Sequence, residues 1–233
     1  GFDTPSFLLA SLSYFAKSSI TFIICRPISS AASWSIAKQS GRKEDFEAYF
    51  KRDLDTYTKE RNVPKGKMKK VHYYSKVIGE KREVYVYTPP QYSKDKKYPV
   101  LYLLHGIGCD GSQWISMKAD IVLDNMIADG ESVPCVVVCP SITPKKNKRT
   151  TQAISPENVE AYEKFDQELI GDLMPFINSN YSVSDKRKDT AVAGLSMGGM
   201  ESLLVGFSHL NRFNHIGSFS AAPSLDTSLL KLT

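Results

Sequence analysis

Metal-ligand clusters, a strong excess of one charge and close cysteine pairs are all missing from this sequence of 233 residues. Its 30 Lys and Arg residues stand against 25 Asp and Glu residues, so the net charge is only +5 and gives little reason to expect a nucleic-acid partner. The four cysteines lack metal-ligand spacing, and we expect neither a metal nor another cofactor. Cys135 and Cys139 lie four residues apart in one predicted strand, about 13 Å, which is too far for a disulfide. With Cys25 and Cys109 far from both, the cysteines do not indicate a redox compartment.

The pattern of apolar residues predicts an α/β fold. With 42% hydrophobic and 24% charged residues, the chain is long enough for one sizeable core. The predicted strands span residues 70–76, 83–87, 98–104, 133–138, 189–193 and 215–219. Helices are predicted at 121–128, from Ser155-Pro156-Glu157 onward, and from Met197 onward. The first two strands form an antiparallel pair, and the later ones alternate with helices. This order predicts a doubly wound sheet that binds ligands at the carboxyl ends of its strands.

The most informative motif is Gly194-Leu195-Ser196-Met197-Gly198, between a predicted strand and a predicted helix. A G-x-S-x-G sequence on such a turn is typical of the nucleophile elbow of α/β-hydrolases, where the serine backbone is strained. The glycines two residues before and after Ser196 lack the Cβ that so sharp a turn excludes. The following helix would direct its free N–H groups toward Ser196. Taken alone, the motif also fits a glycine-rich turn with Ser196 as a helix N-cap.

A second motif lies upstream, where the strand at 98–104 runs into His105-Gly106-Ile107-Gly108. We call the segment at residues 105–111 the oxyanion loop. A strand that ends in H-G-x-G before the elbow is where α/β-hydrolases place the other half of the oxyanion hole. We therefore predict Ser196 as the nucleophile, with the backbone N–H groups of Ile107 and Met197 as oxyanion donors. His105 lies on the wrong element for a general base, and we interpret it as a residue that shapes this loop.

Runs around both motifs carry a family resemblance. They are Val63–Lys67, Val84–Pro90, Tyr92–Tyr98, Tyr102–Gly108, Asn180–Val183, Ala193–Gly199 and Ser218–Pro223. Together they resemble the feruloyl and acetyl-xylan esterases of carbohydrate esterase family one, which are esterase D-like α/β-hydrolases. The closest likeness is to the feruloyl esterase domains attached to bacterial xylanases.

The resemblance implies a serine esterase that acts through an acyl-enzyme. Its substrates would be feruloyl or acetyl esters of plant cell-wall polysaccharide, or small acyl esters. It also implies a secreted protein and allows for xylanase or carbohydrate-binding domains joined to it in a longer chain. The same elbow and oxyanion loop would also serve an S-formylglutathione hydrolase or an acyltransferase. A catalytically inactive carbohydrate-binding or interaction module is a further alternative.

The sequence after the elbow is poor in the residues that a triad requires. In α/β-hydrolases the acid and the histidine both follow the nucleophile. The 37 residues after Ser196 contain two histidines, His209 and His215, and two acidic residues, Glu201 and Asp226. The elbow helix would carry both histidines some 15–20 Å away, Glu201 lies on that helix itself, and Asp226 precedes no histidine. We therefore assign no triad Asp or His in this chain. We expect it to stop before its catalytic machinery is complete, and to be inactive as it stands.

Two other features have ordinary interpretations. Trp114 follows the oxyanion loop and could flank an acyl pocket, but a packed core tryptophan is the simpler interpretation. The basic clusters Lys65–Lys70 and Lys145–Arg149 have no interleaved aromatic residues, so we predict solvated loops rather than sites for nucleic acid or anionic polysaccharide.

The N-terminal 40 residues differ in composition, with only four charged residues. An apolar stretch at 7–25 is interrupted by Lys17 and followed by small residues, but no basic segment precedes it. It could be a weak signal-peptide core, a marginal membrane segment or translated non-coding sequence. The first methionine, Met68, lies inside the family resemblance, so we expect a processed or partial N-terminus. We divide the chain into an uncertain leader at 1–45 and one esterase domain at 46–233, incomplete at its C-terminus.

Overall fold

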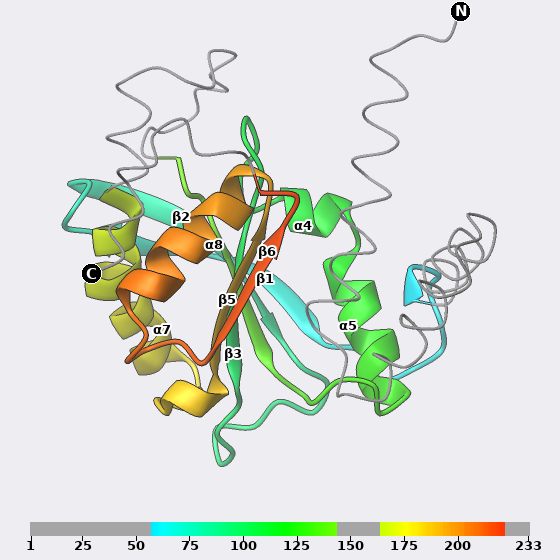
Figure 1. The fold of residues 1–233 in the computed structure, drawn as a ribbon. Coiled ribbons are helices and arrows are strands. Elements are labelled where there is room, and N and C mark those ends of the chain that lie inside the picture. The colour runs from blue at the N-terminus through cyan, green and yellow to red at the C-terminus, as the bar shows by residue number, and fades with distance from the viewer. Residues whose placement is uncertain (1–56, 144–163, 222–233) are drawn as a thin grey trace, which may run out of the picture.

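The computed structural model describes residues 57–143 and 164–221, which form a six-stranded sheet with helices on both faces (Figure 1). The strands are β1 (Lys67–Ser75), β2 (Glu80–Thr88), β3 (Val100–Leu104), β4 (Val136–Pro140), β5 (Thr190–Leu195) and β6 (His215–Phe219). Their order across the sheet is β1-β2-β4-β3-β5-β6. The β1–β2 and β2–β4 pairs are antiparallel, and β4, β3, β5 and β6 run parallel. The predicted antiparallel opening and doubly wound sheet are both confirmed.

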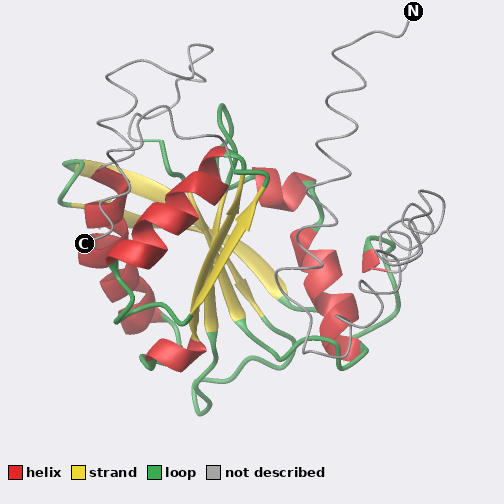
Figure 2. Ribbon diagram, in the orientation of Figure 1, coloured by secondary structure: helices red, strands yellow, loops and turns green. Residues whose placement is uncertain are grey.

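Helices cover the two faces of this sheet (Figure 2). One face carries α4 (Gln113–Ser116) and α5 (Ala119–Ala128). The other carries α8 (Met197–Ser208) and a helix that passes through the π turn η1 (Leu169–Leu173) into α7 (Met174–Asn180). The short 3₁₀ turn η2 (Arg187–Asp189) leads into β5. No helix within 57–143 or 164–221 is both long and apolar enough to cross a bilayer.

The central strand β3 separates two apolar cores. All five of its residues are buried, and they alternate between the faces as the period of a strand requires. Val100, Tyr102 and Leu104 join the core beneath α8 and α7, whereas Leu101 and Leu103 join the core beneath α4 and α5. This two-sided burial fixes the carboxyl end of β3, and with it the start of the oxyanion loop.

Two predicted elements differ from the structure. The strand predicted at 133–138 is β4, which begins at Val136 because Pro134 cannot donate to a sheet and Val133 is 65% exposed. The basic residues Lys67 and Lys69 were predicted in a loop but lie on β1, which begins before the predicted strand at 70–76, and they are exposed. Lysines on an edge strand disfavour pairing with another sheet, so a strand can accommodate this charge.

The helix before β5 contains an irregularity that the apolar spacing does not reveal. Phe165, Leu169 and Leu173 are buried at the spacing of a helical apolar face, but Leu169–Leu173 is a π turn. Pro175 has no N–H, so a regular α-helical ladder cannot continue through this segment. The start of this helix, the basic cluster at 145–149 and the predicted leader lie outside the described residues.

Candidate active site

Ser196 occupies a sharp turn between β5 and α8, as the sequence predicts. Its backbone has φ 57° and ψ −115°, in the left-handed half of conformational space that residues with a Cβ rarely adopt. The Ser196 N–H donates to the carbonyl of Phe219 on β6 (2.8 Å), and its carbonyl accepts from the N–H of Met200 in α8 (3.1 Å). The half-buried Ser196 side chain makes no capping hydrogen bond to α8, so the ordinary N-cap interpretation is wrong.

The two elbow glycines are required by close backbone contacts. A Cβ on Gly194 would lie 2.3 Å from the Gly198 carbonyl oxygen. A Cβ on Gly198 would lie 2.4 Å from the carbonyl oxygen of Leu104 and 2.5 Å from that of His105. Backbone atoms cannot rotate away as a flexible side chain can. The start of α8 therefore packs against the end of β3 only because both positions are glycine.

The oxyanion loop begins beside the elbow. A Cβ on Gly106 would lie 3.7 Å from the Ser196 Cβ, so this loop and the elbow are in contact distance of each other. The Gly106 N–H donates to Oε1 of Gln113 at the start of α4 (2.8 Å). Of the two predicted donors, Ile107 is half-buried in this loop and Met197 is the first residue of α8. The sequence does not predict this role of Gln113, because no motif around it indicates that its side chain binds the Gly106 N–H seven residues earlier.

His105 is a structural residue, as predicted. It is fully buried, and its Nε2 accepts a hydrogen bond from the N–H of Ile142 (3.0 Å). An accepting Nε2 places the proton on Nδ1, which lies 2.7 Å from the Gly106 carbonyl and donates to it. Burial, the largest effect, lowers the pKa of His105 to about 4. The neutral ring thereby joins the oxyanion loop to the segment that follows β4, and neither of its nitrogens is free to act as a base.

We expect this imidazole to make the protein less stable in acid. Its pKa is about 4 when folded and 6.5 by the reference value, so between these pH values only the unfolded chain takes up the proton. The free energy of unfolding should therefore fall as pH drops from about 6.5 to 4, by on the order of 3 kcal/mol from this group. Urea unfolding at several pH values measures the loss. His105→Asn should be less stable at pH 7 but lose less over this interval, whereas the exposed control His215→Gln should retain the wild-type slope. An unchanged slope in His105→Asn would assign the acid sensitivity to other groups.

Two further histidines lie far from the elbow. His209 caps the distal end of α8 and contacts Asp166 (Nε2 to Oδ1, 2.7 Å). Because α8 has 12 residues, this end is about 18 Å from Ser196. His215 begins β6, whereas Phe219, which contacts Ser196, ends it, a separation of about 13 Å along the strand. Both histidines are therefore surface or packing residues, as predicted.

The fourth histidine is equally remote. His72 lies on the edge strand β1, four strands from β5 and so about 19 Å across the sheet. It contacts Glu83 on β2 (Nε2 to Oε1, 3.3 Å). Glu201 is buried on α8, and Asp226 lies outside the described residues. All four histidines of the sequence are described, and each is either distant from Ser196 or bound to backbone through both ring nitrogens.

Trp114 belongs to the core. Its side chain is completely buried in the apolar cluster that contains Leu103, Val137 and Leu195. The packed-core interpretation therefore holds, and we assign Trp114 no acyl-pocket role.

The three described cysteines form no disulfide with one another. Cys109 is exposed in the oxyanion loop, whereas Cys135 and Cys139 are buried. Burial raises the pKa of Cys135 to about 12 and raises that of Cys139 as well, so both remain protonated. In residues 57–143 and 164–221, no group of three or more His, Cys, Asp or Glu side chains is arranged to hold a metal ion.

Comparison with known proteins identifies the family. The Esterase family model matches residues 75–229, which include the oxyanion loop and the elbow. The chain belongs to this esterase family. The match covers more than half of the sequence and begins at the end of β1.

The relatives of this chain include both a curated sequence and solved structures. The chain is 34% identical over 176 residues to an endo-1,4-beta-xylanase/feruloyl esterase of Xylanibacter ruminicola, covering 72% of this chain and 23% of that protein. A CE1 ferulic acid esterase from Anaeromyces mucronatus, solved with ferulic acid, is 31% identical with a TM-score of 0.66, over 73% of this chain and 64% of that one. A feruloyl esterase module from Clostridium thermocellum, complexed with sinapinate, is 25% identical with a TM-score of 0.57, over 68% and 55%. The chain thus has the α/β-hydrolase fold and spans less than two thirds of these relatives' own lengths.

Proposed function

We propose that Ser196 is the nucleophile of a serine esterase that cleaves feruloyl or acetyl esters of plant cell-wall polysaccharide. The observation that carries the proposal is the strained Ser196 turn between β5 and α8, in contact distance of the oxyanion loop. The membership in the Esterase family supports the reaction class. The names of a xylanase/feruloyl esterase and a ferulic acid esterase among its relatives support the substrate class.

The reaction would proceed in two acyl transfers. Ser196 Oγ attacks the ester carbonyl carbon while its proton passes to the general base, and the N–H groups of Ile107 and Met197 stabilise the oxyanion of the tetrahedral intermediate. Collapse of this intermediate breaks the ester bond, releases the sugar hydroxyl with a proton from the general acid, and leaves Ser196 acylated. Water then attacks the acyl-enzyme and gives a proton to the base, which passes it to Ser196 Oγ as the carboxylic acid is released. The N-terminal end of α8 adds a positive dipole end beside the same oxygen.

We propose that the histidine and the acid of the triad come from sequence outside residues 1–233. The support is the placement of the four histidines, since His105 is bound to backbone and the others are about 13 Å or more from Ser196. A general base must come within hydrogen-bond reach of the serine hydroxyl.

We also propose that the protein acts outside the cell. A cell-wall polysaccharide is a polymer that cannot enter a cell, so an enzyme for its esters must meet it there. Fusion to a xylanase, as in the Xylanibacter ruminicola relative, would keep the esterase near this substrate. Detection of the protein in cell-free culture fluid tests the location, and confinement to the cells would contradict it.

A substrate panel tests the reaction. The full-length protein is expected to hydrolyse methyl ferulate and feruloylated xylan, with acetylated xylan as the next best substrate. Preference for S-formylglutathione would favour an S-formylglutathione hydrolase instead, and transfer of the acyl group to an added alcohol would favour an acyltransferase. Binding of xylan without any hydrolysis would identify an inactive binding module. The same assay on residues 1–233 alone tests the source of the base, because activity equal to that of the full-length protein would contradict our assignment.

A further inference from the structure

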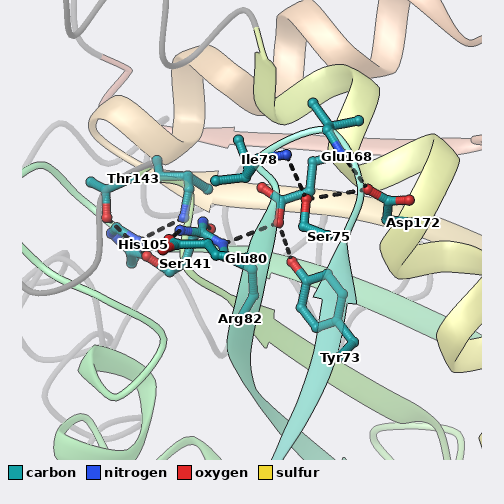
Figure 3. A network of polar contacts seen from close by, with 12 residues as sticks. Tyr73, Ser75, Ile78, Glu80, Arg82, His105, Ser141, Thr143, Glu168 and Asp172 are labelled. Atoms are coloured by element: carbon teal, nitrogen blue, oxygen red, sulfur yellow. Dashed lines mark hydrogen bonds and ion pairs between the residues drawn. The ribbon is translucent and has the colours of Figure 1, made fainter.

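A buried ion pair lies beside the segment that follows β4 (Figure 3). Arg82 on β2 is 5% exposed, and its Nε donates to Oε1 of Glu168 (3.1 Å), which is 1% exposed. The Tyr73 hydroxyl on β1 donates to the same carboxylate oxygen (2.6 Å). Burial and the nearby carboxylate raise the pKa of Tyr73, so the hydroxyl stays protonated. A buried pair of this kind is a weak source of stability, because desolvation offsets most of the attraction. Stability alone therefore does not account for this buried ion pair.

A second nitrogen of the guanidinium, Nη2, lies at the carboxyl end of β4. Arg82 Nη2 donates to the carbonyl of Ser141, the residue directly after β4 (2.8 Å). The next residue, Ile142, donates its N–H to Nε2 of His105 (3.0 Å). A planar guanidinium holds its donors in a fixed fork, so Arg82 orients Ser141 relative to Glu168 as no single ammonium group could.

The chain of contacts ends on the peptide that carries a predicted oxyanion donor. His105 Nδ1 donates to the Gly106 carbonyl (2.7 Å). That carbonyl and the Ile107 N–H belong to one planar peptide, which is trans because the described residues contain no cis bond. The two groups therefore point in opposite directions, and the hydrogen bond to His105 sets the direction of the Ile107 N–H. Oxyanion donors act only when they are aimed at the position of the developing charge.

We propose that Arg82 is a positioning residue for the oxyanion loop, acting through the Ser141–Ile142 segment and His105 on the Gly106–Ile107 peptide. The inference rests on the proposed esterase function. Arg82 touches neither substrate nor Ser196 in this scheme. Its role is to hold the Ile142 N–H against Nε2, which keeps the His105 proton on Nδ1 and the ring in place.

The test is Arg82→Lys in the full-length protein, assayed on methyl ferulate. Lysine keeps the positive charge beside Glu168 but cannot also hold Ser141 with a fixed fork. We expect kcat to fall at least about tenfold with KM within about twofold of wild type, since only a transition-state interaction is disturbed. The matched control Tyr73→Phe removes a hydrogen bond from the same carboxylate but keeps Arg82 with its donors to Glu168 and Ser141, and it should keep the wild-type kcat. Equal kcat in Arg82→Lys and Tyr73→Phe would overturn the inference, whereas an inactive wild type would instead refute the proposed function.

A double-mutant cycle with His105→Asn tests the route. If Arg82 acts through His105, Arg82→Lys should lower kcat by less than about twofold in the His105→Asn background. A full, additive loss there would overturn the route. Should Arg82→Lys not fold, the triple variant Tyr73→Phe, Arg82→Met, Glu168→Leu replaces the buried polar group with apolar side chains of similar size. It should show the same kcat loss relative to Tyr73→Phe, and a wild-type kcat would again overturn the inference.

Discussion

Ser196→Ala is expected to lower kcat on methyl ferulate by on the order of a millionfold in the full-length protein, as removal of the serine does in a well-studied serine protease. The alanine variant keeps the two predicted oxyanion donors but has no oxygen to form the acyl-enzyme. Folding should change little, because the backbone at this position is held by the hydrogen bonds to Phe219 and Met200 rather than by the hydroxyl. Initial rates and thermal unfolding together separate the two effects.

A fluorophosphonate probe gives a direct reading of the same prediction. It should label the wild type and the control Ser208→Ala, whose serine is exposed at the far end of α8, but should not label Ser196→Ala. Labelling that persists in Ser196→Ala would place the nucleophile elsewhere. A full-length wild type that is not labelled at all would contradict the hydrolytic function itself.

The elbow was predictable because its requirements are local in sequence. A strand, a helix and two glycines around Ser196 all lie within about twenty residues, and each leaves a recognisable pattern. His105 was likewise assigned its role from the element on which it lies. The family resemblance rests on the runs around these motifs, and the comparisons confirm the family.

The supporting contacts were not predictable, because they depend on which strands are neighbours. Arg82 meets Ser141 only because β2 pairs with β4 instead of with the next strand in the sequence. Nothing in the sequence around Arg82 distinguishes it from the exposed basic residues nearby, and its partner Glu168 is 86 residues away. Side chains that act across a sheet become visible only when the strand order is known.

The second large effect is expected for Gly198→Ala, which should lower both stability and activity. The added Cβ would lie 2.4 Å from the Leu104 carbonyl oxygen and 2.5 Å from that of His105, so α8 must move away from the end of β3. Overpacking of this kind costs about 1–3 kcal/mol, and more where only backbone can yield. The melting temperature should fall by roughly 5–10 °C for a domain of this size. Activity should fall further than the stability loss explains, because the shift displaces the Met197 N–H from the oxyanion position.

Gly171→Ala is the matched control for this substitution. Gly171 lies in the helical segment Leu169–Leu173, and a Cβ there would meet no atom within 4 Å. Alanine should leave activity unchanged and stability equal or raised by up to about 1 kcal/mol, because it reduces the freedom of the unfolded chain. If Gly198→Ala melts within about 1 °C of Gly171→Ala and retains its kcat, the close approach of α8 to β3 does not constrain the elbow. The placement of Met197 as an oxyanion donor would then lose its physical basis.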